Sequence, residues 1–406
     1  MSPISRVAAG AWPITPLGDV CQVVTGSTPP RGESRYFGGS VPWIKPEDLD
    51  TSLYVVGSKE YLTDDGARLA RRVPKGSVLV SCIGKIGKVA IAGVDLAVNQ
   101  QINCLVPGPR VVSEYLYYAM RFEQGNLQDQ ASNTIVPILN KSRFAAVGIP
   151  LPPLADQQRI VAKLDEQMAA LDRADMALAA QQAVARAFKR ATLQTTLDQA
   201  THPEWKCTTL GELCTFANGL WTGKKPPFQQ ASVIRNTNFT SDCTLDFSDI
   251  AHLDVEERQL RSRRLRAGDI ILERSGGGPK QPVGRVALFE LDDESYSFSN
   301  FTSVIRVNER NRVLPRFLWY YLFHLHNSGA TEALQNHTSG IRNLDFSSYV
   351  LLSIPVPTLD EQRRIVDHLD RSIEQTNNLL SYVAGQTLTL VSLRNSFLEA
   401  AFSGEV

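Results

Sequence analysis

Lysines and arginines beside glycines are the side chains best suited to chemistry in this sequence. They occur in GKIGK, residues 84–88, and in ERSGGGPKQPVGR, residues 273–285. Glycines let a backbone approach a phosphate closely, and the neighbouring cations would neutralise it. The same segments are also compatible with solvated hairpin turns. The cations concerned are Lys85, Lys88, Arg274, Lys280 and Arg285.

No group of residues forms a recognisable catalytic site. The second glycine-rich segment fails the G-x-x-x-x-G-K-[ST] pattern, so nucleotide hydrolysis is not indicated. The sequence has no G-x-S-x-G, no H-E-x-x-H and no Asn-Pro-Pro-aromatic loop of the kind that amino-methyltransferases use. Asp269 and Glu273, in DIILER, could belong to a nuclease site, but a buried strand is the simpler interpretation. The six cysteines form no zinc-binding pattern and are expected to be reduced and mostly buried.

Length and composition indicate a multidomain globular protein. A chain of 406 residues with 43% hydrophobic residues is compatible with two or three domains. The formal net charge is zero, so any surface for a polyanion must be local. No apolar run reaches the roughly 20 residues that span a bilayer, and no signal peptide is evident. We therefore expect a cytoplasmic protein.

The sequence repeats itself. IPLPPLADQQRIVAKLD, residues 149–165, returns as IPVPTLDEQRRIVDHLD, residues 354–370, with ten of seventeen positions identical. TPLGDVCQVVTG (15–26) likewise matches TTLGELCTFANG (208–219). A period of about two hundred residues is too long for a solenoid and indicates a duplicated globule followed by a duplicated helix.

Each copy is predicted to contain a mixed α+β globule and a long helix. Short β-branched runs bounded by glycine and proline indicate strands, while EYLYYAMRF and RFLWYYLFHLH have helical spacing. Prolines at 150, 152, 153, 355 and 357 separate each globule from its helix. The predicted segments are a globule over 1–153, a helix over 154–200, a globule over 201–357 and a helix over 358–406.

Apolar residues recur in both predicted helices at alternating spacings of three and four. This period favours an antiparallel coiled coil between the two helices, related by a pseudo-twofold axis. The alternative is an amphipathic helix packed on its own globule. The predicted seam residues are Val161, Leu164, Met168, Leu171, Val366, Leu369, Ile373 and Leu380.

These motifs resemble the specificity subunit of type I restriction–modification systems. The duplicated P-x-P-x-L-x-x-Q-x-R-I-V passage is the most specific element, and TGSTPPRGESRYFGGSVPWIKPEDL (25–49) is also similar. The second copy departs from the pattern, since GLWTGKKPPFQQASVIRNTNF (219–239) stands at that place. The resemblance covers essentially the whole chain.

The resemblance implies that each globule is a target-recognition domain for one half of a bipartite double-stranded DNA sequence. The helices would set the spacer and dock two methyltransferase subunits, and two restriction subunits could also join. Catalysis would belong to those partners. The resemblance implies no cofactor on this chain, with S-adenosylmethionine, ATP and Mg on the partner subunits.

Loop cations and amides are the candidate DNA contacts, because arginine can read guanine and asparagine can read adenine. In the first globule they are Arg31, Lys45, Lys85, Lys88, Asn133, Lys141 and Arg143. In the second they are Lys224, Lys225, Arg235, Asn236, Asn238, Arg274, Ser275, Lys280, Arg285, His337, Arg342 and Asn343. The run RQLRSRRLR (258–266) is expected to make phosphate contacts at most.

Two other functions are compatible with the sequence. One is a scaffold subunit whose globules bind protein without reading bases, and the other is a self-contained nuclease. A bipartite methylation motif that requires this chain would favour DNA specificity over both.

Overall fold

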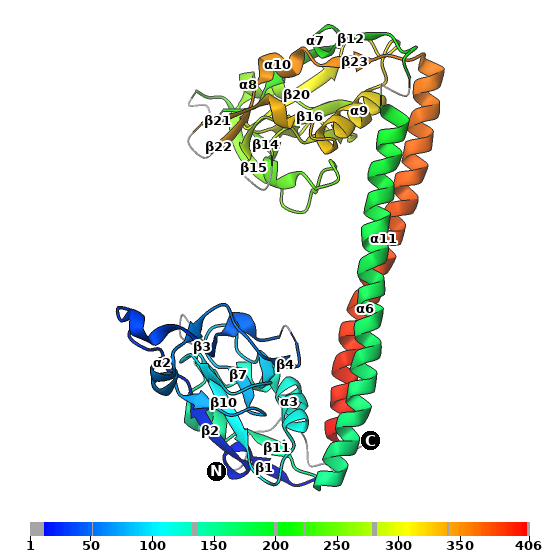
Figure 1. Ribbon diagram of the computed structural model, residues 1–406. Helices are drawn as coiled ribbons and strands as arrows, with labels where there is room; N and C mark the ends of the chain where they lie inside the picture. The colour runs from blue at the N-terminus through cyan, green and yellow to red at the C-terminus, as the bar shows by residue number, and fades with distance from the viewer. Residues whose placement is uncertain are drawn as a thin grey trace. The chain divides into compact units, whose positions relative to one another are not determined.

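The computed structural model describes residues 12–50, 52–131, 137–198, 202–221, 225–277, 282–338 and 341–403. The chain divides into two compact units (Figure 1). Unit 1 comprises residues 1–179 with 384–406, and unit 2 comprises residues 180–383. Each unit contains one globule and a part of each long helix.

The globule of unit 1 is built on two sheets and a short strand pair. The five-stranded sheet has the order β2 (Cys21–Thr25), β10 (Ile102–Pro107), β7 (Val78–Ser81), β8 (Val89–Ala92), β4 (Tyr54–Val55). The four-stranded sheet has the order β5 (Tyr61–Leu62), β3 (Phe37–Ile44), β9 (Leu96–Val98), β6 (Arg72–Val73). The strand pair joins β1 (Ile14–Pro16) to β11 (Gly148–Pro150), so it brings the two ends of the globule together.

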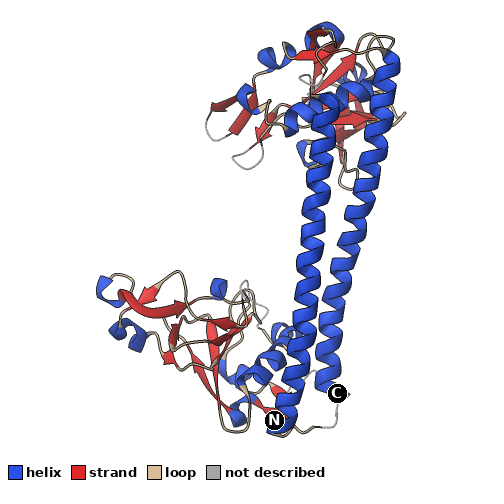
Figure 2. Ribbon diagram, turned by 45° about the vertical axis from the view of Figure 1, so that its right-hand side comes forward, coloured by secondary structure: helices blue, strands red, loops and turns tan. Residues whose placement is uncertain are grey.

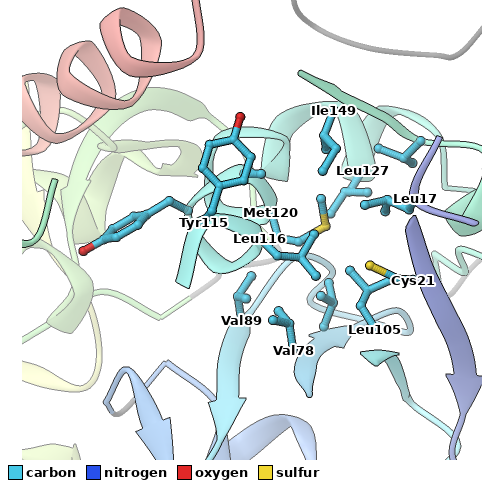
Figure 3. Close-up of a cluster of buried hydrophobic side chains, with 14 of the residues drawn as sticks. Leu17, Cys21, Val78, Val89, Leu105, Tyr115, Leu116, Met120, Leu127 and Ile149 are labelled. Carbon is cyan, nitrogen blue, oxygen red and sulfur yellow. The ribbon is translucent and has the colours of Figure 1, made fainter. Parts of the chain in front are cut away.

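Among the described residues of this globule, five α-helices accompany the sheets. They are α1 (Leu17–Val20), α2 (Asp64–Leu69), α3 (Ser113–Phe122), α4 (Gln124–Asp129) and α5 (Lys141–Ala145). Helix α3 packs on β7 and β8 because its apolar face, which includes Tyr115 and Leu116, is buried. Figure 3 shows Leu116 facing Val78 and Leu105 from the sheet, and Tyr115 and Ile149 of β11 belong to the same core.

The globule of unit 2 repeats this plan with different edges. Its sheets are β13 (Cys214–Asn218), β20 (Thr302–Val307), β16 (Asp269–Glu273), β18 (Val286–Phe289), and β15 (Ala251–Glu256), β14 (Phe228–Ile234), β19 (Tyr296–Phe298). A third sheet has the order β17 (Ser275–Gly277), β22 (Ile341–Leu344), β21 (Gln335–Thr338), and β12 (Cys207–Thr209) pairs with β23 (Ser353–Pro355). Its helices are α7 (Leu210–Leu213), α8 (Glu257–Arg263), α9 (Pro315–Asn327) and α10 (Phe346–Val350).

The two long helices are α6 (Leu154–Leu197) and α11 (Leu359–Ser403), which lie side by side (Figures 1 and 2). In unit 1, Arg394 of α11 pairs with Asp172 and Asp175 of α6, at 2.8 and 2.6 Å. In unit 2, Lys189 of α6 donates to Asn377 of α11, at 3.3 Å. Residues late in one helix therefore meet residues early in the other, so the helices run antiparallel. The expected fold class is confirmed.

The seam residues pack less evenly than the spacing predicted. Leu164, Leu171, Val366 and Leu369 are buried, whereas Val161, Met168, Ile373 and Leu380 are half-buried. Ile160 is more deeply buried than its neighbour Val161. The reason is that the ends of the helices also pack on a globule: Ile160 and Leu164 share the core of unit 1, and Leu369 shares that of unit 2. Both sequence interpretations of these helices therefore hold in part.

Candidate nucleic-acid interface

The joint between globule and helix explains the repeated passage. Gln157 is fully buried, and its side chain accepts from the Val112 amide and donates to the carbonyls of Arg110 and Pro152, all at 2.9 Å. These bonds satisfy main-chain groups that would otherwise be buried without a partner. The glutamine therefore fixes the start of α6 to the loop before α3.

The second joint reproduces the first. Gln362 is fully buried, accepts from the Leu314 amide at 2.8 Å, and donates to the carbonyls of Arg312 and Pro357 at 3.0 and 2.9 Å. The aspartates that both copies of the repeat share also have matching contacts. Asp165 accepts from the Tyr118 hydroxyl at 2.6 Å, and Asp370 accepts from the Tyr320 hydroxyl at 2.5 Å. Each globule is thus held on its helix by the same four hydrogen bonds, three from the glutamine and one from the aspartate of the repeat.

In unit 1 the GKIGK segment is the turn between β7 and β8. Two hydrogen bonds of Ser81 close this turn. Its hydroxyl donates to the Lys85 carbonyl at 2.6 Å, and its carbonyl accepts from the Gly87 amide at 3.0 Å. Gly84 and Gly87 have φ of +74° and +88°, which explains why the turn requires glycine. The Lys85 side chain is exposed. Lys88 instead turns inward and donates to the Pro46 carbonyl at 2.9 Å.

The remaining candidates of unit 1 also include both exposed side chains and side chains engaged within the fold. Arg31, Lys141 and Arg143 are exposed, although Arg143 also donates to the Gln130 carbonyl at 3.1 Å. Lys45 pairs with Glu60, and its ammonium lies 4.8 Å from the centre of the Trp43 ring. Asn133 lies outside the described residues. The structure therefore leaves Arg31, Lys85, Lys141 and Arg143 available on the surface.

In unit 2 the matching turn is organised by a buried ion pair. Arg285 makes two hydrogen bonds of 2.8 Å to Glu273 and also donates to the carbonyls of Phe239 and Asn236, at 2.9 and 3.1 Å. Arg285 corresponds to Lys88, because the Glu273 amide donates to the Arg285 carbonyl as the Ser81 amide donates to that of Lys88. Both cations therefore tie their turn to the main chain that follows β3 or β14.

The possible nuclease carboxylates are engaged within the fold. Asp269 and Glu273 are 0% and 1% exposed. Asp269 forms two hydrogen bonds with Arg306, of 2.7 and 2.6 Å, which also raise the pKa of that arginine. Among the described residues no group of three His, Cys, Asp or Glu side chains is arranged to hold a metal ion. These contacts support the buried strand over the nuclease site.

The cysteines are all free, and Cys207 is exposed while the other five are buried. Burial raises the pKa of the Cys21, Cys82, Cys214 and Cys243 thiols to about 12, so they stay protonated at neutral pH. A protonated, buried thiol is a poor nucleophile.

Several candidates of unit 2 gather near β17. Arg274 donates to Asn218 and Ser303 at 2.5 and 3.2 Å, and burial lowers its pKa. Ser275 donates to Asn343, while Asn236 donates to the Ser275 carbonyl at 2.5 Å. These contacts tie the strands together.

Arg235 and Asn238 have different surroundings. Arg235 is half-buried and pairs with the exposed Asp249 at 3.2 Å. Asn238 is buried and bonds only main-chain groups, namely the Arg235 amide and the carbonyls of Asp246 and Asp249. It therefore shapes the turn after β14.

The other candidates of unit 2 are less fully described. Lys225 is exposed and Arg342 is half-buried. Lys224, Lys280 and the side chain of His337 lie outside the described residues.

Unit 2 also contains a hollow that the sequence did not reveal. Its volume is about 560 Å³, and its lining includes Leu220, Trp221, Val233, Leu253 and Phe301. Trp221 is 63% exposed and Phe301 is 48% exposed. Exposed aromatic side chains around an apolar depression are typical of a recognition surface.

A second apolar surface lies on the helices of unit 2. Val184 and Phe188 of α6 and Leu379 and Tyr382 of α11 are all exposed. All of these except Tyr382 line a groove of about 640 Å³. Large exposed apolar side chains on a paired helix surface favour contact with another protein.

The duplicated plan now has a counterpart among known proteins. The family described as "Type I restriction modification DNA specificity domain" matches residues 10–174 and again residues 203–381. The chain belongs to this family. One matched segment begins in each globule and extends into the helix that follows it. The chain therefore carries two DNA specificity domains of this family, called domain 1 in unit 1 and domain 2 in unit 2.

Individual relatives agree with this assignment. The MjaIX specificity subunit of Methanocaldococcus jannaschii is 34% identical over 159 residues, which are 38% of this chain and 37% of the relative. The StySPI specificity subunit of Salmonella potsdam is 21% identical over 421 residues, covering 97% of this chain and 89% of the relative. A solved chain from work on assembly of a type I R-M system has a TM-score of 0.76 at 22% identity. That match covers 99% of this chain and 100% of the solved one, and it shows the shared fold.

Membership of this family indicates which part of a type I system the chain represents. Specificity subunits are the non-catalytic component of type I systems, and they bind DNA as part of a larger complex. Within the described residues, none of the helices combines the length and the apolar character that crossing a membrane requires.

Proposed function

We propose that this chain directs a cytoplasmic type I restriction–modification complex to a bipartite DNA sequence, with domain 1 and domain 2 each reading one half. The observation that carries the proposal is the duplication of the whole joint, in which Gln157 and Gln362 make the same three bonds. Two domains held identically on antiparallel helices are suited to two half-sites on one duplex.

Within this proposal, the exposed cations contact phosphates. Arg31, Lys85, Lys141 and Arg143 in domain 1 and Lys225 in domain 2 have the exposure that such contacts require. Asn133, Lys224, Lys280 and His337 remain candidates on sequence grounds. The inward contacts of Lys88, Arg285 and Asn238 favour a positioning role for these three residues.

The helices would bind the catalytic partners. The groove beside Val184, Phe188 and Leu379 offers a methyltransferase subunit an apolar surface on paired helices. Two such subunits would carry S-adenosylmethionine, and restriction subunits, where present, would use ATP and Mg. Methyl transfer and cleavage would therefore occur on the partners.

Methylome sequencing tests the proposed function. A strain that expresses this chain with its methyltransferase subunit is expected to gain one split methylation motif, with two specific half-sites around a spacer of fixed length. A strain with the methyltransferase alone serves as the control and should lack this motif. A protein scaffold without base readout would give no new split motif, and a cleavage activity of the purified chain with a metal would favour a nuclease.

The length of the helices should set the spacer. Deleting residues 176–182 and 384–390 removes seven residues from each helix and keeps the seven-residue apolar pattern. Seven residues span about 10 Å of helix, or about three base pairs of DNA. We expect the methylome of this variant to show a spacer shorter by about three base pairs with both half-sites unchanged. Ala177→Gln, an exposed change at constant length, should leave the motif as it was. New half-site bases with the old spacer would contradict the prediction.

A further inference from the structure

Two adjacent turns occupy the same place in both specificity domains. The Gly26 amide donates to the Ile102 carbonyl at 3.1 Å, and the Gly219 amide donates to the Thr302 carbonyl at 3.2 Å. A Cβ atom on Gly26 would lie 2.2 Å from the Asn99 carbonyl oxygen, and one on Gly219 would lie 1.8 Å from that of Ser299. Glycine is therefore required for the turn after the first sheet strand to lie against the turn that precedes β10 or β20.

The residues that follow these glycines differ in chemistry. Ser27 and Leu220 are equivalent, because their amides donate to the equivalent carbonyls of Val98 and Phe298, at 3.1 and 2.8 Å. The next residue is Thr28 in domain 1 and Trp221 in domain 2.

The turn that precedes β10 or β20 also carries a polar residue in domain 1 and an aromatic residue in domain 2. Gln101 and Phe301 are equivalent, since their carbonyls accept from the amides of Cys82 and Arg274. In domain 1 these turns are polar, and Thr28 hydrogen-bonds the side chain of Gln100. In domain 2 they carry the exposed rings of Trp221 and Phe301.

The neighbouring strands differ as well. Trp43 in β3 pairs with Ala97, and at the equivalent place in β14 Val233 pairs with Ser297. Both side chains are 1% exposed, but Trp43 packs in a core cluster of domain 1, while the smaller Val233 contributes to the lining of the 560 Å³ hollow in domain 2. The two domains therefore carry side chains of different size at this place.

We propose that this hollow binds the 5-methyl group of one thymine in the half-site read by domain 2. This rests on the proposed function, and it assigns specificity at one A·T pair to Trp221 and Phe301. In the major groove only thymine presents a methyl group, and apolar side chains are its usual contacts.

The lining itself carries no carboxylate among the described residues. Its one ionisable side chain, Arg235, pairs with Asp249, which lies outside the lining, at 3.2 Å. Asn236 and Asn300 contribute amides to the lining. Apolar side chains together with amides in one lining match the methyl and hydrogen-bonding groups of an A·T edge.

The test compares thymine with deoxyuridine, which lacks only the methyl group. Binding is measured with the chain in complex with its methyltransferase subunits, on duplexes in which each thymine of the domain 2 half-site is replaced in turn. We expect one replacement to weaken binding about four-fold, the value for one buried methyl group. In Trp221→Thr and in Phe301→Gln, which introduce the side chains that domain 1 carries at these places, that difference should disappear. Thr28→Ala, in domain 1, should retain it.

The outcomes separate this inference from the proposed function. If every replacement binds like thymine, or if the four-fold difference persists in both variants, the methyl assignment is wrong while sequence-specific binding stands. If the variants weaken thymine and deoxyuridine duplexes equally, the rings stack on a base or contact the backbone, and the inference is also overturned. If the complex binds no DNA sequence-specifically, the proposed function itself fails.

Discussion

Gln157→Leu is expected to lower the free energy of unfolding of unit 1 by about 2–5 kcal/mol, because it leaves buried main-chain groups without partners. Leucine has a similar size but can neither accept from the Val112 amide nor donate to the carbonyls of Arg110 and Pro152. Denaturant titration followed by hydrogen exchange would measure the loss. Protection should fall first in α3 and at the start of α6.

Gln158 provides the matched control, since it is the next residue along and its side chain is exposed. Gln158→Leu should change the stability by no more than about 0.5 kcal/mol. Gln362→Leu should transfer the effect to unit 2, where the same three bonds are lost. Equal stabilities for Gln157→Leu and Gln158→Leu would show that the buried glutamine does not hold the joint.

The repeated passage allowed much of the fold to be predicted. Prolines, the apolar spacing and the offset of 205 indicated two globules and two long helices, and the structure has α6 and α11 at those places. The sequence showed only that the glutamine of the motif is identical in both copies, and it indicated no role for that residue. Its role depends on the loop before α3, some 45 residues earlier in the sequence, and short-range spacing carries no information about that contact.

The direction of a charged side chain was the least predictable feature of the site. Lys85 and Lys88 lie in one short turn, yet Lys85 is exposed and Lys88 donates to the Pro46 carbonyl. Arg285 was a predicted phosphate contact because it lies near glycines. In the structure it forms an ion pair with Glu273, twelve residues earlier at the end of β16. Strand pairing decides which cations are neutralised within the fold, and pairing between distant segments is not visible in composition.

The hollow of domain 2 was missed for a related reason. The sequence showed that 219–239 departs from its counterpart, and the DNA contacts predicted in this segment were lysines, an arginine and asparagines. The structure shows that the contrast also lies in Trp221, Val233 and Phe301, which come from separate segments and meet only in the fold. Comparing the two copies position by position would have found Trp221 opposite Thr28.

Replacing residues 207–355 by residues 14–150 is expected to convert the split motif into an inverted repeat of a single half-site. The exchange points are equivalent, because Ile14 pairs with Pro150 as Cys207 pairs with Pro355. In this chimera Gln362 would meet the main chain of Arg110 and Val112 in place of that of Arg312 and Leu314, so the second joint should still form. Since the helices run antiparallel, the second copy of domain 1 should read the opposite strand.

The methylome of a strain that carries this chimera and the methyltransferase tests most directly whether each domain reads one half-site. Co-purification with the methyltransferase establishes beforehand that the chimera assembles. We expect a motif in which the half-site of domain 1 appears twice, inverted, around the original spacer, while the half-site of domain 2 is lost. Methylation of the original asymmetric motif by the assembled chimera would contradict it.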